Sequence, residues 1–202
     1  MRLKTTILAT IVIAAPAMAA TLPASADFSL PLPGITAAMD RSLAGPVVVD
    51  RIIPFRSDPG YGHVVSGQVQ MRVIKSNADG NMHYYWCVKN DAGSSEYIRA
   101  FQVIGFPERA YEANWRMDGG GTVAPATVAG VHATIGGFQR RVIAFQFANG
   151  GLGGNQTSRC FFLKSSFPTI DRGTVKGRIK TTTMNIDIAI AAPPVAAITP
   201  LP

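Results

Sequence analysis

Two cysteines are the residues of this chain whose chemistry is easiest to predict. Cys87 and Cys160 are the only cysteines present. In an oxidising compartment a lone pair of cysteines is expected to form a disulfide. Each lies in a segment typical of a strand, 82–89 and 158–165, so we predict a bridge between distant parts of the chain, like the inter-sheet disulfides of β-sandwiches. The alternative is two buried free thiols.

The histidines and cysteines do not have the spacing of a metal site. His83 and Cys87 are four residues apart on a predicted strand, which places them on one face about 13 Å apart. The sequence contains no CxxC or HxxxH spacing, the kind of cluster that supplies zinc ligands. Neither cysteine has the surroundings of a reactive thiol. We therefore expect no metal and no cofactor.

A small secreted hydrolase is the least favoured function. The chain lacks the Gly-x-Ser-x-Gly elbow of the α/β-hydrolases, and no serine is marked as the partner of a histidine in a triad. A glycosidase would need two carboxylates that face each other. The acidic candidates for such a pair are Glu96, Glu108, Glu112, Asp118 and Asp171.

Aromatic side chains are the candidates for ligand binding. Alternate residues of a strand point to opposite faces, so Tyr84 and Trp86 lie opposite Tyr85 and Cys87. If exposed, Tyr84, Trp86 and Trp115 would stack on sugar rings or on the apolar surface of a partner. The alternative is that Tyr84 and Trp86 are core residues, as tryptophan is beside the disulfide of immunoglobulin sandwiches.

The first residues of the chain predict export. A basic head, Arg2 and Lys4, precedes an apolar run over residues 7–15 and a small-x-small pattern, Ala17-Met18-Ala19, the order found in secretory signal peptides. We predict a signal peptide over 1–19, with cleavage after residue 26 as the alternative. The apolar run is about half the ~20 residues of a membrane-spanning helix. We therefore expect a secreted or periplasmic protein of a Gram-negative bacterium without a stable membrane anchor.

The charge of the chain gives a weak positive field without a concentrated basic site. The net charge of +7 falls to +5 once Arg2 and Lys4 leave with the signal. The remaining basic residues are scattered, and only Arg140 and Arg141 are adjacent. Nucleic-acid binding would need a basic patch, so we expect none. Charged residues make up only 15% of the chain, which suits an exported β-protein.

Hydrophobic alternation predicts an all-β fold for residues 46–190. Turns rich in Gly, Asn, Asp and Pro separate segments of period two, and the pattern predicts about eight or nine strands in an antiparallel sandwich of the jelly-roll or immunoglobulin-like type. A closed barrel is the alternative. We expect a linker or loosely attached arm over 20–45, a helical turn over 108–115, loops with one short strand over 118–137, and a Pro/Ala-rich tail over 191–202.

Several of these segments resemble exported bacterial β-sandwich domains of the PEP-CTERM-associated kind. The resemblance rests on Tyr84-Tyr85-Trp86-Cys87-Val88-Lys89-Asn90, on Gly93-Ser94-Ser95 with the strand that follows, and on Phe161-Phe162-Leu163 before Pro168 and Gly173-Thr174-Val175. It implies a sandwich fold and no common catalytic site. The tail departs from the family, since it has neither a membrane span nor a terminal arginine cluster.

These observations favour a non-enzymatic exported protein that associates with a component of the cell envelope or the extracellular matrix, either protein or polysaccharide. A carbohydrate-binding module that uses exposed Tyr and Trp is the alternative. The sequence leaves the oligomeric state open.

Overall fold

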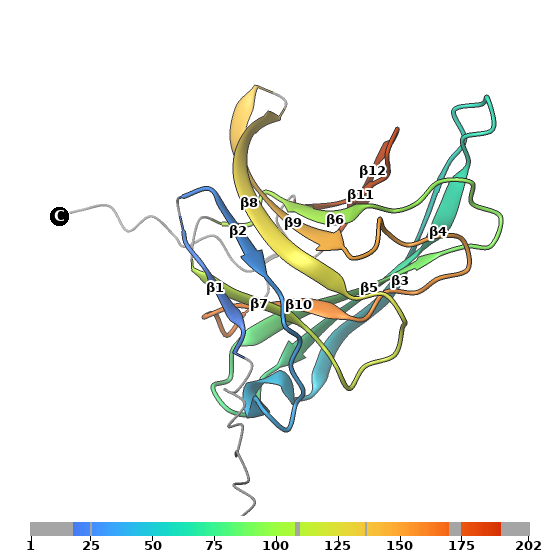
Figure 1. Cartoon of the computed structure of the whole chain (residues 1–202). Coiled ribbons are helices and arrows are strands. Elements are labelled where there is room, and N and C mark those ends of the chain that lie inside the picture. The colour runs from blue at the N-terminus through green and yellow to red at the C-terminus, as the bar shows by residue number, and fades with distance from the viewer. Residues whose placement is uncertain (1–17, 25, 108–109, 136, 170–174, 191–202) are drawn as a thin grey trace, which may run out of the picture.

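The residues that the structure describes form two antiparallel six-stranded sheets packed face to face (Figure 1). The structure, a computed structural model, describes residues 18–24, 26–107, 110–135, 137–169 and 175–190. Most of the predicted signal peptide and the whole predicted tail over 191–202 lie outside these residues. The elements in chain order are β1 (Ala20–Leu22), β2 (Phe28–Pro31), the 3-10 turn η1 (Arg41–Leu43), β3 (Val47–Ser57), β4 (Val65–Lys75), β5 (Met82–Asn90), β6 (Ala100–Ile104), β7 (Tyr111–Trp115), β8 (Pro125–Ile135), β9 (Phe138–Phe147), β10 (Phe161–Lys164), β11 (Lys176–Lys180) and β12 (Asn185–Ala189).

The predicted antiparallel sandwich is confirmed, and the alternative of a closed barrel is wrong. Sheet A has the order β1-β7-β10-β5-β4-β3, and sheet B has the order β12-β11-β6-β9-β8-β2. The two sheets share no strand. Figure 1 shows sheet A below sheet B, with η1 beneath sheet A.

The segment expected to be a linker or a loose arm is part of both sheets. β1 pairs with β7 at the edge of sheet A, and β2 pairs with β8 at the edge of sheet B. Short segments without clear periodicity carry little strand signal of their own. Their pairing is decided by the edges that β7 and β8 offer.

The alternation along β5 shows how the core is built. Tyr84, Trp86 and Val88 are fully buried and face sheet B. The Trp86 ring lies 5.7 Å from Phe101 and 6.4 Å from Phe145, both of sheet B, between ring centroids. Burial of large aromatic side chains from both inner faces supplies most of the apolar area that holds such a sandwich together.

Two local expectations were wrong because tertiary pairing overrides local pattern. The segment predicted as a helical turn over 108–115 contains β7, which pairs with β1 and β10. The glycine- and alanine-rich segment over 118–137 contains β8, eleven residues long, which forms a hairpin with β9. Both segments are strands because a partner strand lies beside them.

Candidate functional site

A row of four side chains crosses the outer face of sheet A: Gln70, Cys87, Cys160 and Arg116. Gln70 lies opposite Cys87 in the β4–β5 register. Cys87 and Cys160 form a disulfide with their Cα atoms 4.3 Å apart. The backbone N–H of Arg116 donates to the carbonyl of Cys160 at 2.7 Å. Opposite residues of neighbouring strands present their side chains on the same face, so the four lie side by side.

The disulfide is confirmed, but the expectation that it bridges the two sheets was wrong. β5 and β10 are neighbours in sheet A, with Phe161 opposite Trp86. Cys87 follows Trp86 and Cys160 precedes Phe161. Because neighbouring residues of a strand point to opposite faces, both cysteines point to the outer face. Both cysteines are half-buried. The bridge indicates a non-reducing compartment.

An open hollow of about 610 Å³ lies over this row. We call it the disulfide hollow. Its floor is the outer face of sheet A, one wall is the segment that enters β3, and the other wall is the pair of loops after β7 and before β10. The lining residues are Ala37, Leu43, Ala44, Gly45, Val47, Gln70, Arg72, Ile74, Tyr85, Cys87, Arg116, Gly119, Gly120, Gly121, Thr157, Ser158 and Cys160.

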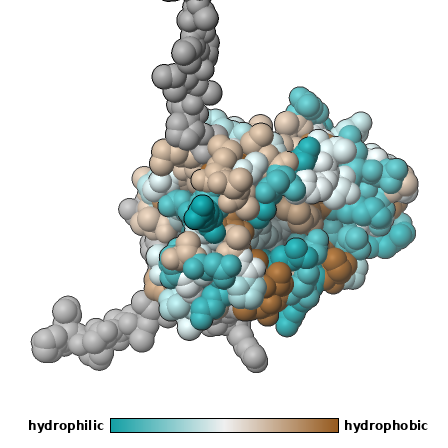
Figure 2. All heavy atoms as spheres, turned by 90° about the horizontal axis from the view of Figure 1, so that it is seen from below, coloured by the Kyte–Doolittle hydropathy of each residue, from teal (hydrophilic) through white to brown (hydrophobic). Residues whose placement is uncertain are grey.

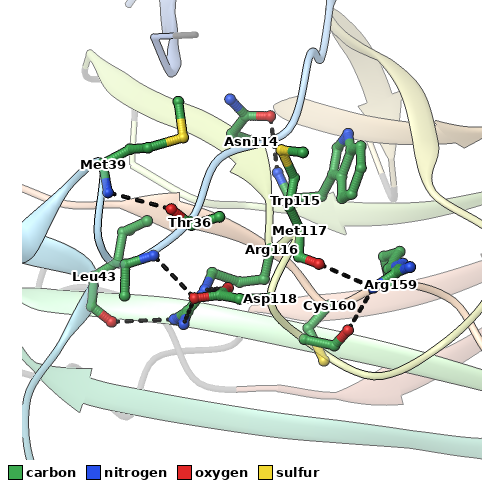
Figure 3. A network of polar contacts seen from close by, with 12 residues as sticks. Thr36, Met39, Leu43, Asn114, Trp115, Arg116, Met117, Asp118, Arg159 and Cys160 are labelled. Atoms are coloured by element: carbon green, nitrogen blue, oxygen red, sulfur yellow. Dashed lines mark hydrogen bonds and ion pairs between the residues drawn. The ribbon is translucent and has the colours of Figure 1, made fainter. Parts of the chain in front are cut away.

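The first wall is a strap, residues 32–46, held against sheet A. Leu43 of the strap packs with Ile74, Tyr85 and Phe162 in a second apolar cluster on the outer face of the sheet. The carbonyl of Leu43 accepts a hydrogen bond from the Tyr85 hydroxyl at 3.2 Å. It accepts another from Nη1 of Arg116 at 3.3 Å (Figure 3). The strap is therefore fixed by packing and by hydrogen bonds.

The second wall is anchored by two arginines. Nη1 of Arg159 donates to the carbonyls of Met117 at 3.0 Å and Gly119 at 2.6 Å. Arg116 and Asp118 form a bidentate ion pair within the same wall (Figure 3). Oδ2 of Asp118 also accepts from the backbone N–H of Ala37 in the strap, at 3.0 Å. The hydrogen bonds from Arg116 lower the pKa of Asp118 to about 2.

A second ion-pair cluster anchors the strap farther from the hollow. Nζ of Lys164 lies 2.9 Å from Oδ2 of Asp40 and 2.8 Å from Oε2 of Glu112. Burial acts to raise the pKa of Asp40, but the hydrogen bonds from Ser42 and Lys164 outweigh it and lower the pKa. His83, opposite Lys164 on β5, is fully buried, and this burial lowers its pKa.

Arg72 supplies the most accessible cationic group of the hollow. Its Nη2 lies 2.6 Å from Oδ2 of Asp50, and Gln70 donates to Oδ1 of the same carboxylate at 2.9 Å. The hydrogen bond from Arg72 lowers the pKa of Asp50. The side chain of Arg72 is 43% exposed, and its Nη1 has no hydrogen-bond partner among the described residues. One edge of this guanidinium is therefore free to meet a ligand.

Exposed apolar residues on β3 lie next to the hollow. Val47, which lines it, is 49% exposed, and Ile52, opposite Gln70, is 55% exposed. Figure 2, which views the molecule from the side of sheet A, shows brown areas separated by teal and pale ones. This face therefore offers small apolar areas between polar groups.

The structure does not place the predicted aromatic ligand-binding residues on the surface. Tyr84 and Trp86 are fully buried in the core, as the alternative given above expected, so they are not placed to stack on a ligand. Trp115 is partly buried, packs against the core, and donates from Nε1 to the carbonyl of Leu32 at 2.9 Å. Strand parity alone separates Tyr84 and Trp86 from Tyr85 and Cys87, but it does not tell which face meets sheet B.

The residues considered for hydrolysis are spread over the molecule. Glu96 lies 2.7 Å from Nδ1 of His63, while Glu112 and Asp118 pair with Lys164 and Arg116. Glu108 and Asp171 lie outside the described residues. Within the described part of the chain, His, Cys, Asp and Glu side chains form no group of three that could hold a metal ion.

The sequence analysis did not find the residues that form the walls of the hollow. The strap, the glycines of 119–121 and Arg116 come together only through sheet A. The one sequence signal for this site was the triple glycine, Gly119-Gly120-Gly121. Glycine allows a ligand to approach the backbone closely because it has no side chain.

Comparisons of the chain with protein-family models, with curated proteins and with solved structures give no significant match. In the part of the chain that the structure describes, no helix has the length and apolar composition needed to cross a membrane.

Proposed function

We propose that this protein is an exported, non-enzymatic β-sandwich that associates with a component of the cell envelope or the extracellular matrix through the disulfide hollow. The observation that carries this proposal is the fixed geometry of the hollow. Hydrogen bonds from Tyr85 and Arg116 tie the strap to sheet A, and those from Arg159 join the two loops of the second wall. A site that is already formed costs little ordering free energy when a ligand binds.

The size and the lining of the hollow support a ligand of mixed character. Its volume of about 610 Å³ falls within the range of about 300–1,000 Å³ that is usual for ligand sites. The half-exposed Val47 offers apolar contact, while Gln70 and Arg72 offer polar groups. A segment of a polysaccharide or of an extended peptide with acidic groups meets these requirements.

Export is part of the same proposal. The predicted signal peptide supports it, and so does the Cys87–Cys160 disulfide, which belongs in a non-reducing compartment. The compartment would be the periplasm or the extracellular space.

Gly120→Trp is the variant that tests the hollow. Gly120 lines it, its φ is not positive, and a Cβ added there meets no atom within 4 Å. A tryptophan at this position adds a bulky side chain to the lining of the hollow, and its Cβ meets no neighbouring atom. Gly93→Trp is the matched control, because Gly93 has the same open surroundings but does not line the hollow.

The measurement is retention on insoluble polysaccharides, peptidoglycan and purified envelope fractions, at low and high salt. We expect the wild type and Gly93→Trp to be retained and Gly120→Trp to lose at least most of that retention. Equal retention of Gly120→Trp and Gly93→Trp on every surface that holds the wild type would overturn the hollow as the binding site. Retention of no form on any of these surfaces would overturn the proposed association.

A carbohydrate-binding module is the second candidate, and one observation favours it. Tyr61 is fully exposed at the tip of the β3–β4 hairpin with a φ of 56°, and Tyr97 is 52% exposed. Exposed tyrosine rings stack on sugars. The test measures retention on a polysaccharide in high salt for the wild type, Tyr61→Ala and Gly120→Trp. Retention of the wild type that Tyr61→Ala abolishes and Gly120→Trp leaves intact would support a carbohydrate-binding module over the hollow.

A further inference from the structure

We propose that the Cys87–Cys160 disulfide is a thiol–disulfide exchange site, open in the folded protein to a low-molecular-weight thiol that carries a carboxylate. The incoming thiol would occupy the disulfide hollow. This inference concerns the reactivity of the floor of the hollow and does not depend on the macromolecular ligand proposed above.

The position of the disulfide makes it accessible without unfolding. Both cysteines are half-buried and line the open hollow, whereas Trp86, next to Cys87 in sequence, is fully buried on the opposite face. Structural disulfides of exported proteins resist reduction, but exposed ones are the labile and regulatory ones. The location of this bridge on the surface of a sheet therefore favours reactivity.

The strands that the disulfide joins stay together by other means. β10 pairs with β5 over four residue pairs and with β7 over four more, from Phe161 to Lys164. The carbonyl of Cys160 also accepts from the backbone N–H of Arg116. Reduction would therefore change the floor of the hollow while the ladder of sheet A remains formed.

Two cations flank the bridge on its two sides. Arg116 lies opposite Cys160, since their backbones share a hydrogen bond. Arg72 lies opposite Tyr85, two residues from Cys87 on the same face, and keeps its Nη1 free. Each guanidinium already pairs with one carboxylate, Asp50 or Asp118, so what the site offers an anionic reactant is the open Nη1 donor of Arg72. The arrangement favours an anionic thiol that arrives beside Arg72.

The exchange balances without any further reactant. The thiolate of the incoming molecule attacks Sγ of Cys87, the S–S bond breaks, and Cys160 leaves as a thiolate beside Arg116. A second molecule of the thiol attacks the mixed disulfide and releases the Cys87 thiolate. Two protons from the thiols neutralise the cysteines. The protein disulfide is reduced to a dithiol, and two thiol molecules are oxidised to one disulfide.

The first test uses the oxidised mature protein and three thiols of different charge: glutathione, 2-mercaptoethanol and cysteamine. The rate of bridge opening is followed by mass spectrometry after alkylation, at equal thiolate concentrations and low salt. We expect a rate that rises linearly with thiol concentration, is about tenfold higher for glutathione than for cysteamine, and gives a mixed disulfide at Cys87.

The second test compares Arg72→Gln with Arg56→Gln, a control arginine that is 68% exposed and does not line the hollow. We expect Arg72→Gln alone to remove the preference for glutathione. Gly120→Trp, which adds a bulky side chain to the lining of the hollow, is expected to slow all three thiols. A rate that is independent of thiol charge and concentration and rises in dilute urea would overturn the proposal, because attack would then need unfolding.

Discussion

Arg116 and Asp118 hold each other in a two-point ion pair, with Nε–Oδ1 at 2.6 Å and Nη2–Oδ2 at 2.9 Å. The pair lies where the two walls of the disulfide hollow meet. Arg116 donates to the carbonyl of Leu43, and Asp118 accepts from the N–H of Ala37. A planar guanidinium suits such a junction because it presents several donors in fixed directions. One ion pair thus joins the end of β7 to the strap.

The stability of the protein is expected to fall at acid pH through Asp118. Its pKa is lowered from 3.8 to about 2 by the hydrogen bonds from Arg116. Because the pKa of Asp118 is lower in the folded state than in the unfolded state, its charge stabilises the fold at pH values above 3.8. This contribution is lost as the pH falls towards 2. Since the Asp118 side chain is 36% exposed, solvent screens the ion pair, and we expect it to contribute about 1 kcal/mol to the free energy of unfolding.

Urea unfolding of the wild type and of Asp118→Asn between pH 2 and pH 6 measures this contribution. Asparagine keeps an oxygen that can accept from Ala37 but removes the charge. We expect the variant to be less stable by about 1 kcal/mol at pH 6 and equal to the wild type near pH 2. A difference that does not change with pH would show that the ion pair is not responsible.

The strap is expected to open when its outer anchor is removed. Asp40 and Lys164 are 21% and 14% exposed, and Asp40 also caps η1 by accepting from the N–H of Ser42. Asp40→Asn removes the ion pair with Lys164 and keeps an oxygen that can cap η1. Tryptic cleavage after Arg41, which is exposed, should become about fivefold faster, as expected if local opening becomes about 1 kcal/mol easier.

Asp58→Asn is the control for this experiment. Asp58 lies 3.7 Å from Arg56 at a surface where both side chains are largely exposed, 47% and 68%. Such pairs contribute little, so cleavage at Arg41 should stay at the wild-type rate. Equal rates for Asp40→Asn and the wild type would mean that the contacts at Leu43 and Ala37 hold the strap without the Asp40–Lys164 pair.

Trp86 is expected to be a stability residue. It is fully buried among Phe101, Phe145 and Phe161, with ring centroids 5.7, 6.4 and 6.2 Å away. Trp86→Ala should cost about 3–5 kcal/mol of unfolding free energy, and Trp86→Phe much less, because phenylalanine leaves a smaller cavity. Chemical denaturation followed by circular dichroism measures both values. A cost below 1 kcal/mol for Trp86→Ala would contradict the assigned core position.

The fold class could be predicted from the sequence because strand periodicity is local. The alternation along β4 and β9 and the turns between strands appear in the printed residues. β7 was missed and β8 was expected only as a short strand, since their pattern is weak and each depends on a partner strand, β10 and β9. The edge strands β1 and β2 were missed for the same reason.

The sequence by itself predicted that Cys87 and Cys160 would pair, because they are the only two cysteines in the chain. It also determined that Trp86 and Cys87 lie on opposite faces of a strand. Only the tertiary structure decided which face is inside. Sheet B covers Trp86, so the disulfide lies on the outer face, where the strap and the loop after β7 border it beside Arg116. A two-residue period fixes which side chains share a face, while packing between sheets far apart in sequence fixes which face meets solvent.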